Sequence, residues 1–152
     1  MDATLRQATL KDIPGMHRVR LAVRENRLTS SVISEEHYIP AIETTGRGWV
    51  IEVDGDIVAF AVGNKDTGNI WALFVDPDHE GFGYGRRLHD AMVAWLFQNN
   101  IQRLHLSTAS GTRAEKFYEK AGWTQTEQRE NAEVFFERFN PLKASTFIAL
   151  EC

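Results

Sequence analysis

Residues 71–96 read WALFVDPDHEGFGYGRRLHDAMVAWL and decide the interpretation of the whole chain. Residues 71–75 form a short apolar run rich in β-forming residues, and Asp76 and Pro77 close it as turn residues. Further on, apolar side chains recur at intervals of three and four, at Leu88, Ala91, Met92, Trp95 and Leu96. This spacing is one face of a helix. The stretch therefore predicts a strand, a turn, a loop and an amphipathic helix.

Glycine occupies every second position of that loop, at 81, 83 and 85. Glycine loses more backbone entropy on folding than other residues, so its repetition indicates a local requirement. A backbone without side chains can wrap around an oxygen-rich group, and the positive end of the helix dipole favours an anion there. Arg86 and Arg87 fall in the first helical turn, where the dipole disfavours cations unless an anion lies nearby. The loop is predicted to hold a diphosphate.

Composition and charge exclude several classes of protein. The chain has 152 residues and a formal charge of −4, and an acidic chain is not typical of nucleic-acid binders. No apolar run approaches the roughly 20 residues that span a bilayer, and the first residues lack the apolar core of a signal peptide. The one cysteine, Cys152, excludes an internal disulfide and argues against a structural zinc site. We expect a cytoplasmic protein without metal, nucleic-acid or membrane partners.

The remaining elements follow from apolar patterns and turn residues. The Asp54-Gly55-Asp56 turn between two β runs predicts a hairpin. Strands are expected at residues 5–8, 49–53, 57–62, 71–75, 103–107, 123–127 and 134–139. Helices are expected at residues 10–25, from Ser34 with an interruption or a kink at Pro40, from the glycine loop to Asn100, and at 112–121. Residues 140–152 are expected to form a tail or an extra strand.

Two motifs in this order of elements resemble those of the GNAT N-acetyltransferase superfamily. Residues 80–85, EGFGYG, resemble its acetyl-CoA pyrophosphate loop, Gln/Arg-x-x-Gly-x-Gly/Ala, with Glu80 in place of the usual Gln or Arg. Residues 114–123, AEKFYEKAGW, resemble its motif Ala-x-x-x-Tyr-x-x-x-Gly-Phe. Gly111 stands where that superfamily often has Asn. The resemblance covers residues 1–139, which we interpret as one GNAT-like domain.

The resemblance implies a fold and a cofactor site. The fold is α/β, with a mixed, mostly antiparallel sheet of about seven strands, splayed between strands 4 and 5, and helices on both faces. Acetyl-CoA is implied as the co-substrate. Its pantetheine arm is implied to pair with the backbone of the fourth strand at Leu73, Phe74 and Val75. Its diphosphate is implied to bind Gly81, Phe82, Gly83, Tyr84, Gly85 and Arg86.

The implied reaction is direct attack of a primary amine on the thioester in a ternary complex. Tyr118 is implied as the general acid for the leaving thiolate, because a phenol of pKa about 10 keeps its proton at neutral pH. A lysine-type amine has a pKa of about 10.4 and needs a base, whereas an α-amine near 8 scarcely does. Residues 69–75 contain no acid, so Glu25 is the candidate base, with Glu35 and Glu36 as alternatives.

The acceptor and the oligomeric state stay open. The negative net charge of the chain favours a small cationic amine as the acceptor, and a protein or peptide amine is the alternative. A non-catalytic acyl-CoA-binding module is a further alternative, because Glu80 and Gly111 depart from the motifs. A Rossmann-type nucleotide site is excluded, because the glycine spacing is not Gly-x-Gly-x-x-Gly. A homodimer is one of the states left open.

Overall fold

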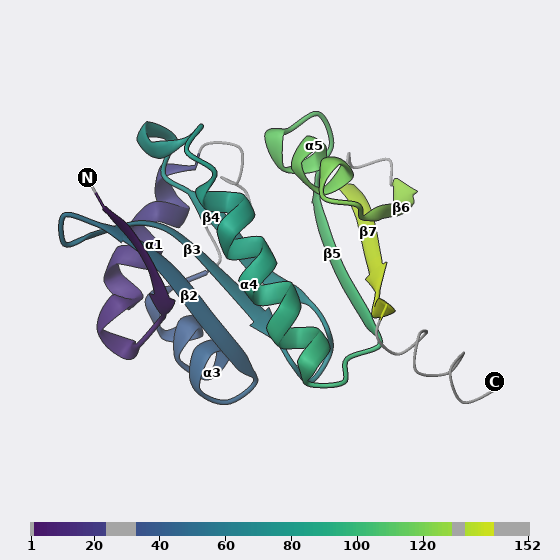
Figure 1. The fold of residues 1–152 in the computed structure, drawn as a ribbon, viewed down its shortest axis with the longest axis horizontal. Helices are drawn as coiled ribbons and strands as arrows, with labels where there is room; N and C mark the ends of the chain where they lie inside the picture. Colours follow the sequence, from purple (N-terminus) through teal and green to yellow (C-terminus); the bar gives the residue numbers. More distant parts are fainter. Residues whose placement is uncertain (1, 24–32, 129–132, 142–152) are drawn as a thin grey trace.

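The computed structural model describes residues 2–23, 33–128 and 133–141. Its strands form two sheets (Figure 1). The first sheet has the order β1-β2-β3-β4, with β1 at Ala3–Gln7, β2 at Gly46–Val53, β3 at Asp56–Asn64 and β4 at Ile70–Val75. The second has the order β5-β7-β6, with β5 at Arg103–Ala109, β6 at Thr124–Gln128 and β7 at Glu133–Phe139. Each pairing within these sheets is antiparallel.

The two sheets meet at one end of β4 and β5 and diverge from there. An isolated parallel bridge joins Asn69 to His105, and the His105 N–H donates to the Gly68 carbonyl at 3.0 Å. The His105 ring lies at the same junction, with Nε2 3.1 Å from the Thr67 carbonyl. Beyond this point β4 is the edge of its sheet, so part of its backbone faces the gap. The predicted splay between strands 4 and 5 is confirmed.

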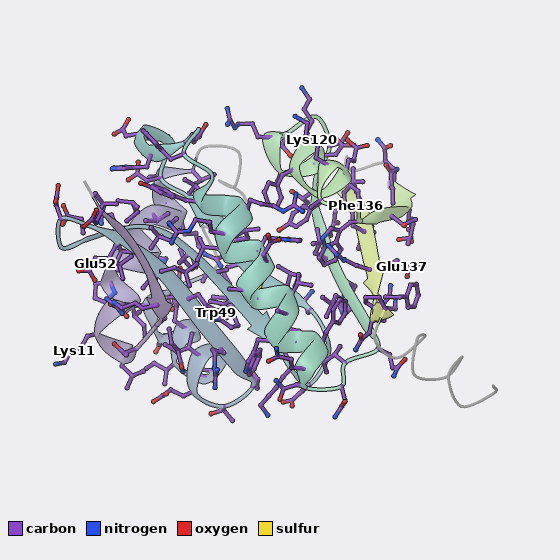
Figure 2. The ribbon with its side chains drawn as sticks, in the orientation of Figure 1. Lys11, Trp49, Glu52, Lys120, Phe136 and Glu137 are labelled. Carbon is purple, nitrogen blue, oxygen red and sulfur yellow. The ribbon has the colours of Figure 1, made fainter. Side chains whose placement is uncertain are left out.

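Helices cover both faces of the first sheet, as predicted. Their bounds are Ile13–Ala22 for α1, Tyr38–Glu43 for α3, Tyr84–Gln98 for α4 and Arg113–Lys120 for α5. Side chains of α4 and α5 belong to one buried cluster, and those of α1 and α3 to a second cluster on the other face. Figure 2 labels Trp49 on β2 and Phe136 on β7, and both belong to the first cluster. That cluster therefore joins the two sheets.

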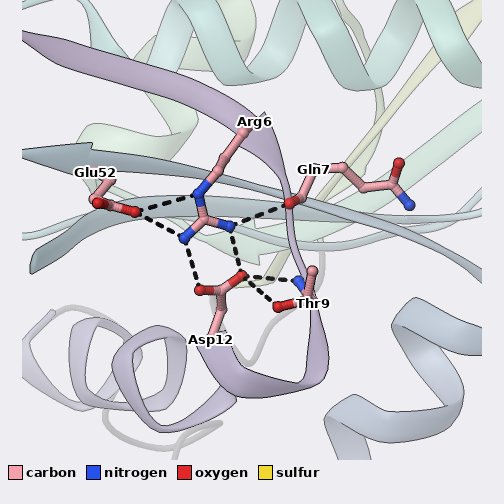
Figure 3. A network of polar contacts seen from close by, with 5 residues as sticks. All are labelled: Arg6, Gln7, Thr9, Asp12 and Glu52. Atoms are coloured by element: carbon pink, nitrogen blue, oxygen red, sulfur yellow. Dashed lines mark hydrogen bonds and ion pairs between the residues drawn. The ribbon is translucent and has the colours of Figure 1, made fainter. Parts of the chain in front are cut away.

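A polar network fixes the entry into α1 (Figure 3). Arg6 on β1 pairs with Asp12 and with Glu52 on β2, each at 2.8 Å. Asp12 also accepts hydrogen bonds from the Thr9 N–H at 2.8 Å and the Thr9 hydroxyl at 3.2 Å. The bonds from Arg6 hold the pKa of the Asp12 carboxyl below its usual value. Thr9 and Asp12 thus form a capping pattern at the start of a 3₁₀ turn over Leu10–Asp12.

Several boundaries differ from the prediction or lie outside the described residues. The first helix is described only to Ala22, and residues 24–32 are not described. Pro40 does not interrupt α3, because it lies in the first turn, where its missing N–H removes no helical bond. The expected tail or strand at 140–152 falls almost wholly outside the described residues. In the described part of the chain, no helix is long and apolar enough to cross a membrane.

Candidate active site

The gap between β4 and β5 contains a cleft of about 1140 Å³. A pocket for one small ligand typically measures about 300–1,000 Å³, so this cleft is slightly larger than that range. Leu73 and Val75 on β4 pack with the α4 cluster, whereas Phe74 packs with the α1 cluster. Because β4 lines the cleft with side chains of both faces, the cleft reaches both faces of the sheet.

The cleft therefore has two ends, which we name by the helices beside them. The α4 end is bounded by the glycine loop, the start of α4 and α5. The α1 end is bounded by Arg20, Val23, Trp71 and Phe74. A ligand at the α4 end and a second ligand at the α1 end can meet at the edge of β4.

The glycine loop has the conformation that an anion site requires. Gly81 and Gly83 have φ of 87° and 81°, in the left-handed region that glycine adopts without strain. The first helical bond of α4 runs from the Arg87 N–H to the Gly83 carbonyl at 3.1 Å. Among the described residues, no protein acceptor is recorded for the backbone N–H groups of residues 81–86. These N–H groups and the helix dipole favour an anion in the loop.

Most of the predicted cofactor residues line this cleft. They are Leu73, Phe74, Val75, Gly81, Gly83, Tyr84, Gly85 and Arg86. Phe82 is not among the lining residues. Its ring is 66% exposed and stacks on Tyr84 with 5.6 Å between centroids. Arg86, in the first turn of α4, pairs with Asp90 at 3.1 Å.

The two departures from the family motifs have structural explanations. Glu80 pairs with Arg113 at the start of α5, with 2.9 Å between Oε2 and Nη2. This ion pair spans the cleft from the glycine loop to α5, because both residues line it. Gly111 has φ of 79°, and its N–H donates to the Glu115 carboxylate at 2.6 Å. Glycine therefore suits the left-handed turn that precedes α5.

Tyr118 on α5 lies in the wall of the cleft, among aromatic side chains of the first cluster. Its ring contacts Phe117, Trp123 and Phe136 with centroid distances of 5.2, 5.4 and 6.1 Å. Burial raises the pKa of the Tyr118 phenol above its ordinary value of 10. The hydroxyl therefore carries its proton throughout the neutral and mildly alkaline range and can donate it.

His89 lies behind Tyr118, at 6.5 Å between ring centroids, and was not predicted from the sequence. The Trp123 indole N–H donates to its Nε2 at 2.9 Å, and its Nδ1 lies 2.9 Å from the Asp90 carboxylate. Nε2 thus accepts, so the proton of the neutral ring sits on Nδ1 and is donated to Asp90. Burial lowers the pKa of His89. The sequence did contain one signal for the burial of His89, because this residue follows Leu88 on the apolar stripe of the helix.

The buried His89 predicts a pH-dependent stability. Below about pH 6.5 the unfolded chain binds a proton that folded His89 resists, so the free energy of unfolding falls as pH falls, by at most about 1.4 kcal/mol per pH unit. Urea unfolding between pH 8 and pH 5 measures this slope. His89→Gln should flatten the curve in this range. His37→Gln, at an exposed histidine, is the matched control, and an unchanged slope in the His89 variant would contradict the assignment.

Among the described residues, the carboxylates that line the cleft do not include the predicted alternatives Glu35 and Glu36. Glu25, the predicted base, lies outside the described residues. Glu35 and Glu36 are exposed on the 3₁₀ turn before α3 and do not line the cleft. Glu133, the first residue of β7, does line it. The sequence showed it only as part of a polar loop before an apolar run.

Positive charge predominates in the described part of the cleft, although the whole chain carries a formal charge of −4. Among the described residues, the lining includes two acids, Glu80 and Glu133, against five basic side chains, those of Arg20, Arg86, Arg113, Lys116 and Lys120. In the described ranges, no group of three or more His, Cys, Asp or Glu side chains could hold a metal ion. The cleft is suited to ligands that carry phosphate or carboxylate groups.

Comparisons with known proteins agree with this geometry. A mycothiol acetyltransferase of Beutenbergia cavernae is 34% identical over 82 residues, which are 50% of this chain and 28% of that protein. The chain thus matches less than a third of that relative's length. The ribosomal-protein-S18-alanine N-acetyltransferase of Escherichia coli superposes with a TM-score of 0.74 at 16% identity, covering 91% of this chain and 94% of that one.

A third relative was solved with coenzyme A. The PaiA N-acetyltransferase of Thermoplasma acidophilum, in complex with coenzyme A, superposes with a TM-score of 0.72 at 13% identity, covering 91% of this chain and 99% of that one. At such identities the structural matches show the fold. The family model of the acetyltransferase (GNAT) family matches residues 16–123, which include the glycine loop and the Tyr118 motif. The chain therefore belongs to the GNAT family of acetyltransferases.

Proposed function

We propose that this protein transfers the acetyl group of acetyl-CoA to the primary amine of a small molecule. The observation that carries the proposal is the cleft through the sheet, which has an anion-binding loop at its α4 end and a separate α1 end. Two substrates that enter from opposite faces meet beside β4 and Tyr118. Direct attack in a ternary complex needs such an arrangement, because it brings the reacting atoms together without a covalent intermediate on the enzyme.

Acetyl-CoA fits the α4 end through backbone groups of this chain. Its diphosphate would bind the N–H groups of the glycine loop, from Gly81 to Arg86, with Phe82 and Tyr84 stacked beside them. Its pantetheine amides would pair with the free edge of β4 at Leu73, Phe74 and Val75. Hydrogen bonds to a charged group contribute roughly 1.5–3 kcal/mol each, so a few of them support micromolar affinity.

The chemistry requires one proton donor and, for a basic amine, one proton acceptor. The amine nitrogen attacks the thioester carbonyl, and the carbon–sulfur bond breaks as the tetrahedral adduct collapses. Tyr118 donates a proton to the departing sulfur, and burial of the phenol keeps that proton available. We propose Glu133 as the acceptor of the amine proton, since it lines the cleft. Glu25 stays a prediction, because it lies outside the described residues.

A small acceptor is supported by the recessed α1 end, where Arg20 is only 2% exposed. A protein or peptide amine is the second candidate, because the Escherichia coli neighbour is named for a ribosomal protein. The positive lining does not favour the cationic acceptor that the acidic composition suggested. A non-catalytic acyl-CoA-binding module would use the same α4 end without turnover. We also propose a cytoplasmic location, from the sequence features alone. A homodimer stays a prediction.

Two measurements test the function. First, acetyl-CoA and coenzyme A, but not NADH, should raise the melting temperature by several degrees, because a ligand at 100 times its Kd contributes about 2.7 kcal/mol. Second, release of the coenzyme A thiol should depend on an added amine and should yield the acetylated amine by mass spectrometry. Binding without release for any amine would support the non-catalytic module. No thermal shift with either coenzyme A ligand would refute the proposal.

A further inference from the structure

The glycine loop carries a large apolar side chain on its outer surface. The ring of Phe82 is 66% exposed, the highest value among the exposed large apolar side chains of the described residues. Phe82 does not line the cleft, although its neighbours Gly81 and Gly83 do. A single exposed apolar side chain is common on protein surfaces and needs no explanation by itself. Phe82 differs from such a side chain in its place inside the proposed diphosphate loop and in its contact with Tyr84.

Phe82 and Tyr84 form a pair of nearly parallel rings, which we call the loop platform. The two ring planes are inclined by 23°, and 5.6 Å separates the centroids. Tyr84, the first residue of α4, packs against the first buried cluster and lines the cleft, so its ring is anchored. Tyr84 thus supports Phe82, while most of the Phe82 side chain stays open to solvent. A ring that is already supported loses little freedom when a second ring stacks on it, which favours binding.

The covalent structure of coenzyme A brings a flat ring close to this platform. Its diphosphate joins the pantetheine arm on one side and the adenosine group on the other, and one ribose separates the diphosphate from the adenine. If the pantetheine arm follows β4 into the cleft, the adenosine group leaves the glycine loop on the outer side. Phe82 lies on that side, because it belongs to the loop but not to the cleft lining.

The basic side chains of α5 offer the adenosine group another route. Arg113 and Lys116 line the cleft, and Arg113 is paired with Glu80 at 2.9 Å. Cations attract phosphate groups, but adenine carries no charge at neutral pH. A purine gains more from an aromatic face, on which it stacks through its whole ring system. The loop platform therefore suits the base better than α5 does.

We propose that the adenine ring of acetyl-CoA stacks on the exposed side of Phe82. The inference rests on the proposed function and extends its cofactor site from the diphosphate to the base. Stacking uses the face of the base and not its hydrogen-bonding edge. Phe82 is thus a binding residue for the nucleotide end of the cofactor, and the reacting thioester lies at the other end.

The first test is a proton NMR spectrum of coenzyme A bound to the native protein. A proton that lies over the face of an aromatic ring is shielded by the ring current. The two protons on the adenine ring should therefore move upfield on binding. In Phe82→Ala this upfield shift should be largely lost, whereas Phe82→Trp should retain it.

The second test compares two ligands that differ in the adenosine group. Calorimetric titration should show that Phe82→Ala weakens the binding of coenzyme A by about 5- to 100-fold, the range that stacking of one base contributes. Phosphopantetheine lacks the adenosine group, so its affinity should change less than about twofold. Phe82→Trp should bind coenzyme A with native affinity.

Phe139→Ala is the matched control. Phe139 is 60% exposed, lies on β7 opposite Arg103 and does not line the cleft. Its replacement removes the same exposed ring at another place and should leave the affinity for coenzyme A unchanged. Equal melting temperatures of the Phe82 and Phe139 variants would show that both are folded.

The outcomes separate this inference from the proposed function. Native affinity of Phe82→Ala for coenzyme A, or adenine protons without an upfield shift in the native complex, would refute the stacking and leave the acetyltransferase intact. An equal loss for coenzyme A and phosphopantetheine would show that Phe82 supports the loop, which also refutes a contact with adenine. No binding of coenzyme A to the native protein would overturn both proposals.

Discussion

Tyr118→Phe is expected to lower kcat by about 100- to 10,000-fold, the range that general acid catalysis contributes. The ring contacts with Phe117, Trp123 and Phe136 do not use the hydroxyl, so the variant should fold and keep its packing. Acetyl-CoA affinity should change less than about twofold, because the proposed binding groups are backbone atoms of the glycine loop and β4. Steady-state kinetics and calorimetric titration with coenzyme A measure the two quantities.

The pH dependence of kcat provides a second check on Tyr118. Burial raises the pKa of this phenol above 10, so the acid keeps its proton at every pH up to about 10. Native kcat should therefore show no loss from Tyr118 deprotonation in this range. A Tyr118→Phe variant with native turnover would show that another group, or solvent, protonates the thiolate.

Gly83→Val is expected to weaken acetyl-CoA binding by about 10- to 100-fold. Gly83 caps α4 with φ of 81°, a conformation that costs a β-branched residue about 1–3 kcal/mol. Nothing lies within 4 Å of an added Cβ, so the effect is one of backbone conformation. If the chain relieves the strain by rotating, the N–H groups of the loop turn away from the diphosphate. Calorimetric titration with coenzyme A measures the loss.

Gly55→Val is the matched control for this prediction. Gly55 lies in the β2–β3 turn with φ of 85°, and an added Cβ there also meets nothing within 4 Å. Both variants should lose a similar free energy of unfolding, about 1–3 kcal/mol. Only Gly83→Val should lose coenzyme A affinity. Equal affinities in the two variants would place the diphosphate outside the glycine loop.

Local signals in the sequence were sufficient for much of the architecture. The Asp54-Gly55 turn has φ of 52° and 85°, as a tight hairpin requires, and the predicted hairpin is confirmed. The glycine loop and its helix were predicted because their signals lie within a few residues of one another. The Tyr118 motif was recognised for the same reason, although its catalytic role stays a prediction.

The residues that the sequence did not reveal depend on contacts between distant segments. Arg20 follows Met16 by four positions on the buried stripe of α1, but only the packing of α1 against β4 surrounds it with Trp71 and Phe74. The burial of the His89 ring is explained by its hydrogen bond from the Trp123 indole N–H, 34 residues away in the chain. Glu133 enters the cleft because β7 pairs with β5. None of these partners is specified by local spacing.

The two ends of the cleft are built from different kinds of atoms. The α4 end presents main-chain N–H groups and a free strand edge, which most point mutations leave unchanged. The α1 end is made of side chains, Arg20, Trp71 and Phe74, each of which one codon change can replace. If the α1 end binds the acceptor and the α4 end binds acetyl-CoA, as proposed, acceptor preference can diverge among descendants of this protein while the binding of acetyl-CoA is inherited intact.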